Sequence, residues 1–385
     1  MLGKLLFLLA LLSILVLYKN SFFRICILIY AYPLWIMYGL MLGDEPTRII
    51  SATGYYYYAE YLKEAVLTAI ASFVAFLIPL WKVRNEEYSF PTIRVSKTTN
   101  IAVFSLFIFS ICAAYPSVFY LSDSRFGSMG SLVVIFFATW MITVGNSNES
   151  TSKLQFAVAL SVVAFAIIRG ERVDFILMLC LMLFYYFKTS RINLLYLSVP
   201  LISIFALGMY GGLSRGGESL NISSLIEEIV ANLSSLGTAV DVVHVYLSSV
   251  WYVNAIGYTL EPIINILMSV FPSNNYGGAS SEYNYVWILR DYINNVGGGM
   301  FYTAFMLAAG PILTVVSGYI YGYLLKKMFL LKTKYGIVFI MFFIMQLRLQ
   351  WYGPNYFGSI VLFSIIFVVF IKLLKNIGVY IEAKE

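Results

Sequence analysis

Runs of apolar residues close to twenty in length recur along most of this sequence, and they constrain the fold more than any other feature. An α-helix rises about 1.5 Å per residue, so about 20 apolar residues cross the roughly 30 Å hydrocarbon core of a bilayer. The chain is 61% hydrophobic and 11% charged, whereas about a quarter of a soluble domain is charged. The runs lack the ten-residue alternation of an outer-membrane barrel. The sequence therefore predicts an all-α polytopic membrane protein.

Windows of low charge predict about eleven transmembrane helices. The predicted spans are residues 3–17, 22–43, 61–81, 100–120, 129–146, 154–169, 173–187, 192–211, 300–324, 336–350 and 358–374. The first span is interpreted as a retained helix, because no small-residue cleavage site follows it, and a signal peptide is the alternative. The spans divide the chain into an N-terminal bundle of about eight helices (1–210), a long polar segment (211–299), and about three C-terminal helices with a short tail (300–385).

Lysine and arginine in the connections predict the orientation, because cytoplasmic loops of membrane proteins are enriched in these residues. One side of the predicted topology collects 16 of the 25 Lys and Arg residues, and the other side holds 9. The first side is therefore predicted to be cytoplasmic and to contain the C-terminus. Residues 211–299 are predicted to form one large outer loop.

The outer side is unusual in its choice of basic residue, since 7 of its 9 are Arg whereas 12 of the 16 inner ones are Lys. A planar guanidinium with five donors matches phosphate and carboxylate oxygens, which suggests anion binding at the outer surface. Salt bridges to outer Asp and Glu are the alternative role. The outer arginines are Arg48, Arg125, Arg169, Arg172, Arg215, Arg290 and Arg348.

The outer loop, residues 211–299, carries patterns for three short amphipathic helices. Capping boxes at 224–227 and 238–241 predict two helices, the second of which runs to about Val253. Pro262 begins a third helix that is too short to span a membrane. We expect these helices to lie along the outer interface or to dip into it.

Two candidate site groups precede or open the outer loop. Arg169 and Arg172 lie at the rim of a hairpin between two spans, where ionisable residues are costly. A capped turn that pairs them with nearby carboxylates is the alternative. Arg215 and Glu218 lie in the Gly-rich stretch 211–218, where backbone N–H groups can approach an anion. This stretch lacks the Gly-Lys-Ser/Thr of a phosphate loop, and a flexible linker is the alternative.

A third group is formed by Asp241 and His244, which lie three residues apart and therefore on one helix face. A carboxylate in this position can orient an imidazole and raise its basicity. His244 is the one histidine of the chain. The pair is a candidate for general base catalysis. A structural histidine and a capping role for Asp241 are the alternatives.

Two further groups flank the return of the chain to the membrane. Glu282 and Arg290 lie in a polar stretch that leads into a glycine run, and an ordinary re-entry loop is the alternative. Arg348 is followed by Trp351 and Tyr352 at the last outward turn. Aromatic rings beside an arginine suit a sugar next to a pyrophosphate, although aromatic belts occur at every membrane interface.

The sequence lacks the residue patterns that several kinds of chemistry require. It contains no Asp-x-Asp pair, and its three cysteines fall inside apolar runs. A metal-dependent nucleotide-sugar site and a zinc hydrolase are therefore not expected, and neither a metal nor a cofactor is predicted. Acidic residues in the middle of spans, which transporters use, are almost lacking. No nucleic-acid partner is expected.

Three patches resemble the Wzy-type O-antigen polymerases, bacterial inner-membrane enzymes that join lipid-linked oligosaccharide repeat units. The patches are Ile167-Ile-Arg-Gly-Glu-Arg-Val-Asp-Phe175, Ser214-Arg-Gly-Gly217 and the stretch 281–299. Together they cover a small fraction of the chain. About eleven spans with one large outer loop in the C-terminal half agree with this resemblance.

The resemblance implies a metal-independent glycosyltransferase that uses an undecaprenyl-pyrophosphate-linked glycan as donor during O-antigen or related surface polysaccharide synthesis. It also implies a chain-length regulator protein as a partner. The outer arginines would stabilise the leaving pyrophosphate, and the base would be His244 with Asp241, or a carboxylate such as Glu218 or Glu282. An O-antigen ligase and a lipid-linked oligosaccharide flippase are the alternative functions.

Overall fold

The computed structural model describes a large part of the chain. The described segments are residues 2–43, 59–86, 240–271, 275–277, 281–292, 298–331 and 345–376, with a few single residues between them. Most of the predicted span 336–350 lies outside the described residues. The same holds for the first predicted helix of the outer loop and for the five predicted spans between residues 100 and 211.

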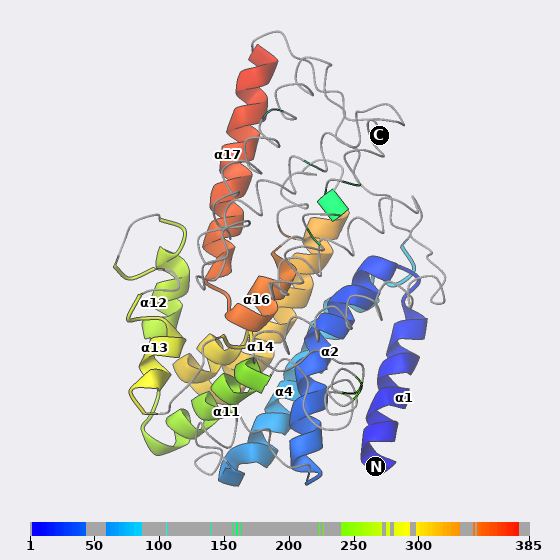
Figure 1. The fold of residues 1–385 in the computed structure, drawn as a ribbon, viewed down its shortest axis with the longest axis vertical. Coiled ribbons are helices and arrows are strands. Elements are labelled where there is room, and N and C mark those ends of the chain that lie inside the picture. The colour runs from blue at the N-terminus through cyan, green and yellow to red at the C-terminus, as the bar shows by residue number, and fades with distance from the viewer. Residues whose placement is uncertain are drawn as a thin grey trace. The chain divides into compact units, whose positions relative to one another are not determined.

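The described residues are almost entirely helical, as predicted (Figure 1). Within the described residues, three segments are long and apolar enough to cross a membrane, namely Phe22–Met41, Ala59–Trp81 and Thr303–Leu330. The elements are α1 (Leu2–Leu17), α2 (Ser21–Met41), the 3₁₀ helix η2 (Ala59–Tyr61), α4 (Leu62–Trp81), α11 (Val240–Ala255), α12 (Glu261–Met268), α13 (Tyr285–Arg290), α14 (Thr303–Leu330), α16 (Gln346–Tyr352) and α17 (Tyr356–Asn376).

Two compact units make up the chain. The first contains Met1–Tyr88, Glu227–Lys327 and Gln346–Val361, and the second contains Ser89–Ile226, Met328–Met345 and Leu362–Glu385. The first unit combines segments from all three predicted regions of the chain. It contains the described residues from which the candidate site below is built.

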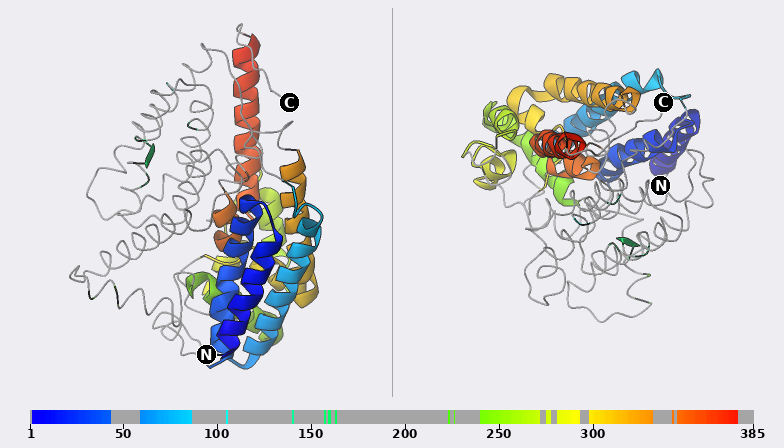
Figure 2. Two further views of the ribbon diagram at one scale, coloured as in Figure 1. Left: turned by 90° about the vertical axis from the view of Figure 1, so that its right-hand side faces the viewer. Right: turned by 90° about the horizontal axis from the view of Figure 1, so that it is seen from above.

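The first unit is built on α1, α2 and α4, which lie side by side (Figure 2). Asn20 caps α2 by accepting a hydrogen bond from the backbone N–H of Phe22 at 2.9 Å. The last carbonyls of a helix lack intrahelical partners, and Arg24 supplies donors at the end of α1. Its Nε donates to the carbonyl oxygens of Leu15 and Tyr18 at 3.0 and 2.6 Å.

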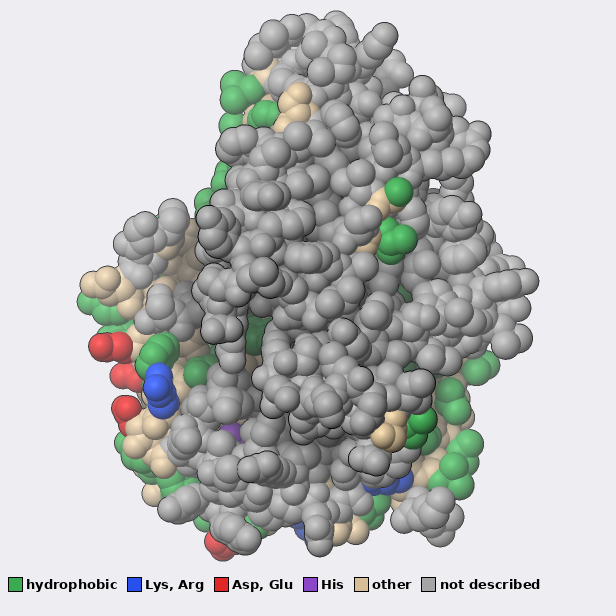
Figure 3. Space-filling view, in the orientation of Figure 1, with side chains coloured by type: hydrophobic (Ala, Val, Ile, Leu, Met, Phe, Trp, Pro, Cys, Tyr) green, Lys and Arg blue, Asp and Glu red, His purple; other side chains and the backbone are tan. Residues whose placement is uncertain are grey.

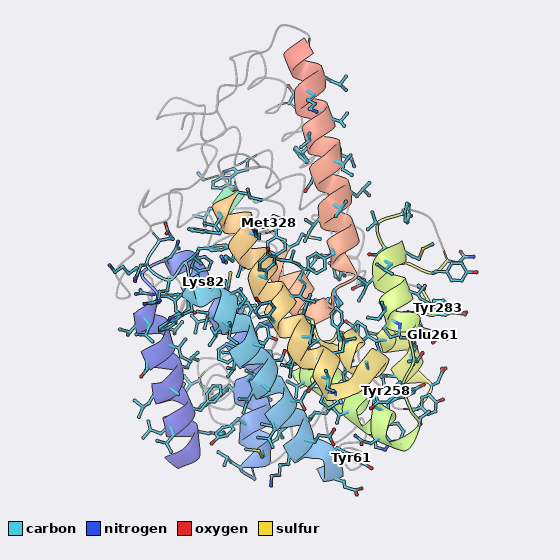
Figure 4. The ribbon with its side chains drawn as sticks, turned by 180° about the vertical axis from the view of Figure 1, so that it is seen from behind. Tyr61, Lys82, Tyr258, Glu261, Tyr283 and Met328 are labelled. Carbon is cyan, nitrogen blue, oxygen red and sulfur yellow. The ribbon has the colours of Figure 1, made fainter. Side chains whose placement is uncertain are left out.

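Helices α4 and α14 approach each other closely through two glycines of α14. A Cβ built on Gly318 would overlap the backbone carbonyl of Ser72, and one built on Gly322 would overlap that of Phe76. Small residues four apart are the usual way for membrane helices to bring their backbones together. Gly318 faces Ser72 and Gly322 faces Phe76, so the contacts advance by four residues in the same direction along both helices. The two helices therefore run parallel. Lys327, near the end of α14, is therefore level with the end of α4, and Figure 4 shows Lys82 and Tyr61 at opposite ends of α4.

A buried polar chain adds to this packing. The Tyr30 hydroxyl donates to Ser72 Oγ at 2.8 Å, and Ser72 Oγ donates to the carbonyl oxygen of Thr314 at 2.9 Å. The Tyr30 ring also stacks on that of Phe76, with centroids 4.6 Å apart. Three helices, α2, α4 and α14, are therefore joined at one depth of the bundle.

The predicted span 300–324 is helical, but α14 is interrupted within it. Ala309 has φ −156° and ψ 28°, and Gly310 has φ 67° and ψ −151°. The Phe301 and Tyr321 rings lie 4.6 Å apart, whereas twenty residues of straight helix would separate them by about 30 Å. The chain therefore reverses direction at Ala309–Gly310.

This reversal divides α14 into a short half-helix and a long helix. The half-helix runs from Thr303 to Ala308 and extends away from the depth in the bundle at which Tyr30 lies. The long part, Pro311–Leu330, is by itself long enough to span a bilayer. The loop after α11 covers the turn, since the backbone N–H of Thr259 donates to the carbonyl oxygen of Leu307 at 2.9 Å. Sequence periodicity does not reveal such a reversal, because both halves are apolar.

Replacing Gly310 by alanine is expected to destabilise the protein by about 1–2 kcal/mol, because its φ of 67° is unfavourable for an L-residue. The added Cβ would also lie 3.1 Å from the Tyr258 ring (Figure 4). A lower melting temperature in detergent checks this. Ile312→Ala, at an exposed position two residues away, is the control. Equal melting temperatures for Gly310→Ala and the wild type would contradict the described turn.

The predicted second helix of the outer loop is confirmed as α11. Its described side chains from Val242 to Val250 are all buried, and the helix contacts α2, α4 and α13. The Tyr246 hydroxyl donates to the carbonyl oxygen of Ala65 at 3.1 Å. A helix that is covered on every side belongs to a protein core. This helix therefore packs inside the first unit.

Candidate functional site

The candidate site is built from two stretches that are distant in the sequence, the first comprising residues 284–292 and 298–303 and the second comprising residues 346–358. Helix α13 lies in the first stretch. Asn284 begins it, since its side-chain oxygen accepts a hydrogen bond from the backbone N–H of Val286 at 3.0 Å. Tyr285 and Leu289 are buried in the core beside α11. Arg290 is the one charged residue of α13, and charged side chains gather at the surface near α12 and α13 (Figure 3).

The C-terminus of α16 is capped by the first stretch. The last carbonyls of a helix need partners from elsewhere, and three carbonyls at this end find them in residues 285–301. The Tyr285 hydroxyl donates to the carbonyl of Tyr352 at 2.7 Å. The backbone N–H groups of Gly299 and Phe301 donate to the carbonyls of Trp351 and Gln350, each at 2.9 Å. We call this arrangement the α16 cap.

Two glycines make room for Tyr285 within the α16 cap. Gly299 has φ 152° and Gly353 has φ 100°, values that L-residues rarely adopt. A Cβ on either glycine would overlap the Tyr285 ring. Burial raises the pKa of Tyr285 well above its usual value, and the phenols of Tyr356 and Tyr352 raise that pKa further. The hydroxyl therefore stays protonated and remains a donor.

Each stretch carries one of the predicted arginines, and each arginine lies against an aromatic ring. The Arg290 guanidinium is 4.8 Å from the centroid of the Trp287 ring, and Arg290 is exposed at the end of α13. The Arg348 guanidinium is 5.4 Å from the centroid of the Tyr356 ring, and Arg348 is half-buried in α16. Each arginine side chain is therefore held against an aromatic ring by a cation–π contact.

Uncharged polar side chains are buried beside the α16 cap. The Tyr321 hydroxyl donates to Gln346 Oε1. In the part of the chain that the structure describes, Thr303 Oγ1 and Asn355 Oδ1 are buried without a hydrogen-bond partner. Burial of such a group without a partner costs about 1–3 kcal/mol. A polar ligand that reached these groups would recover that cost.

The structure brings together the two predicted groups that flank the return to the membrane. Arg290, Arg348, Trp351 and Tyr352 all lie on segments joined by the α16 cap. Trp351 is half-buried, and its Nε1 donates to the carbonyl oxygen of Ile29 at 3.4 Å. Glu282 is exposed in the turn before α13.

The other predicted groups lie outside the two stretches of this site, although α11, which carries His244, packs against α13. His244 is fully buried in α11, and its carbonyl accepts a hydrogen bond from Ser248 Oγ at 2.8 Å. The side chain of Asp241 lies outside the described part of the structure, so its pairing with His244 stays a prediction. Arg169, Arg172, Arg215 and Glu218 lie outside the described residues.

Sequence reasoning missed Tyr285 and the buried amides. Tyr285 is one of many tyrosines in an aromatic-rich chain, and no spacing marks its partner, the carbonyl of Tyr352. Gln346 and Gln350 did carry a signal, because two amides four residues apart lie in or beside a predicted span. Polar residues at such positions are often functional.

Comparison with known proteins gives no relative. No protein-family model, no curated protein and no solved structure matches this chain. Among the described residues, no group of three or more His, Cys, Asp and Glu side chains is arranged to hold a metal ion.

Proposed function

We propose that this protein is a membrane glycosyltransferase that joins lipid-linked oligosaccharide repeat units into a surface polysaccharide of the O-antigen type. The donor is a glycan on undecaprenyl pyrophosphate, and the acceptor is a terminal sugar hydroxyl of another lipid-linked unit. The sequence patches quoted above suggest this chemistry. Three helices that are apolar enough to cross a membrane are consistent with a lipid-linked substrate.

The observation that carries the proposal is the α16 cap. It links the segment with Arg290 to the segment with Arg348 through three hydrogen bonds. Glycosyl transfer to a lipid pyrophosphate donor requires fixed positive charge where the leaving group becomes more negative. Two arginines on rigidly joined segments would supply such charge without a metal ion. The buried amides and the aromatic rings nearby suit the hydroxyls and the apolar faces of sugars.

The reaction needs a base as well as a charged clamp. The acceptor hydroxyl attacks the anomeric carbon, its proton passes to the base, and undecaprenyl pyrophosphate leaves with the electrons of the broken C–O bond. A base must lie within hydrogen-bond distance of the proton that it takes. Full burial of His244 and exposure of Glu282 favour a carboxylate, Glu282 or Glu218, as the base.

The surface polysaccharide of a deletion strain tests this function. A polymerase mutant is expected to carry single repeat units on its lipid A core. A ligase mutant would retain long lipid-linked chains and leave the core bare, and a flippase mutant would trap repeat units inside the cell. The second or the third result would replace the proposed function.

Purified protein is expected to keep its polymerising activity in excess EDTA, because arginines rather than a metal ion stabilise the leaving group in this proposal. The measurement is the polymer yield from lipid-linked repeat units with and without the chelator. An added divalent ion serves as the control. Loss of polymer in EDTA, with rescue by Mg²⁺ or Mn²⁺, would exclude the metal-independent mechanism.

A lipid-linked oligosaccharide flippase is the second candidate, and one observation favours it. Helix α14 reverses at Ala309–Gly310, and interrupted helices are common in transporters. Gly299 and Phe301, which precede α14, are, however, held by the α16 cap. The deletion strain separates the two functions, as described above.

A further inference from the structure

Of the three hydrogen-bond donors in the α16 cap, Tyr285 is the one that donates through its side chain. Gly299 and Phe301 donate through their backbone N–H groups, which every residue except proline would offer at those positions. Tyr285 donates through its hydroxyl, so its contribution depends on residue type. A change at Tyr285 can therefore loosen the cap without altering the backbone.

Tyr285 also connects the two segments that carry the predicted arginines. It is the first residue of α13, and Arg290 is the last residue of the same short helix. Its partner Tyr352 is the last residue of α16, one turn after Arg348. Its ring fills the space beside Gly299 and Gly353. Arg290 is therefore connected to Arg348 through α13, the hydrogen bond from Tyr285 to the Tyr352 carbonyl, and α16.

From this arrangement we infer that Tyr285 is a positioning residue, which fixes the segment that carries Arg290 against the segment that carries Arg348 for the transfer reaction. This inference rests on the proposed glycosyl transfer. Tyr285 touches neither the substrate nor the reacting atoms in this role. It acts through the Tyr352 carbonyl and through the two glycines that its ring contacts.

Such a role predicts a particular kinetic change in Tyr285→Phe. Binding of the lipid-linked donor depends on many contacts, whereas stabilisation of the leaving group depends on the placement of the arginines. A misplacement of about 1 Å can cost on the order of 10²-fold in rate. We therefore expect kcat to fall by about tenfold or more while KM stays within about twofold.

Tyr283→Phe is the matched control. Tyr283 lies two residues earlier, is half-buried, and packs against the Tyr276 ring with centroids 5.1 Å apart. It loses the same hydroxyl, at a position that makes no described contact with α16. Its kcat and KM are expected to match those of the wild type.

A second readout does not depend on activity. Met300 is buried between the two backbone donors of the cap, so a Met300→Cys reporter in a background without the native cysteines is expected to react slowly with a maleimide. Adding Tyr285→Phe is expected to speed this labelling by about fivefold or more, because a missing hydrogen bond favours local opening. Adding Tyr283→Phe is expected to leave it unchanged.

The two readouts separate the possible failures. Faster labelling with an unchanged kcat would show that Tyr285 holds the segments together but positions nothing for the reaction, and the inference would be wrong. Unchanged labelling would show that the hydroxyl does not hold the cap, which overturns it equally. If the wild-type protein makes no polymer from lipid-linked units, the proposed function fails, and the positioning role fails with it. The labelling ratio then still decides whether Tyr285 joins the two segments.

Discussion

Arg290→Lys and Arg348→Lys are each expected to lower the rate of polymer formation by about 10²–10³-fold, which is the usual loss when one fixed donor to a developing charge is removed. Lysine keeps the positive charge but loses the planar pair of N–H donors that fits two phosphate oxygens. A role in surface ion pairing alone would tolerate this change, since such a pair contributes about 0–1 kcal/mol to stability. The two roles therefore predict different results at equal protein level.

Arg84→Lys provides a matched control for these variants. Its guanidinium lies 4.0 Å from the centroid of the Trp81 ring, so it makes the same kind of contact as the two site arginines, at the end of α4. Cells with Arg84→Lys are expected to make polysaccharide of normal chain length. The measurements are chain-length distribution, membrane content of the protein, and initial rate with purified lipid-linked units.

The Arg→Lys test extends to three further predicted arginines, Arg169, Arg172 and Arg215, which lie outside the described residues. We expect at least two of the five Arg→Lys variants to leave single-unit glycan while the protein still accumulates in the membrane. Wild-type chain-length distributions in all five variants would show that an arginine clamp is the wrong account of this site.

Local patterns were enough to predict most of the described helices. The apolar runs at 3–17, 22–43 and 61–81 correspond to α1, α2 and α4, and Pro262 marks the first turn of α12. These elements are set by local composition and by capping residues, which can be identified from a single sequence. The number of spans beyond the described residues stays a prediction.

Contacts between distant residues could not be predicted in this way. The α16 cap depends on the hydrogen bond from Tyr285 to the Tyr352 carbonyl, and no local pattern encodes that pairing.

The reversal in α14 did have a local signal, because Gly310-Pro311 breaks an apolar run. The polar surroundings of α11 in the sequence predict that this helix lies at the membrane interface. Its own Val- and Tyr-rich composition agrees better with the buried position that it takes.

Gly318→Val and Gly322→Val are expected to prevent stable insertion of the protein, with the largest loss of stability among the changes considered. Each added side chain would meet a backbone carbonyl of α4, that of Ser72 or that of Phe76. Overpacking a close-packed interior usually costs about 1–3 kcal/mol, and more when the neighbouring group cannot move. A backbone carbonyl inside a helix cannot change rotamer, so α4 and α14 must separate.

Separation of these helices would also break the hydrogen bond from Ser72 to the Thr314 carbonyl. We therefore expect little protein in the membrane and a strongly lowered melting temperature for any that is purified. Ile320→Val is the control, since Ile320 lies between the two glycines in the sequence and its side chain is exposed. Normal accumulation and melting of both glycine variants would mean that α4 and α14 do not pack through these residues. It would equally contradict their parallel arrangement, because the same two glycines fix the register that makes the helices parallel.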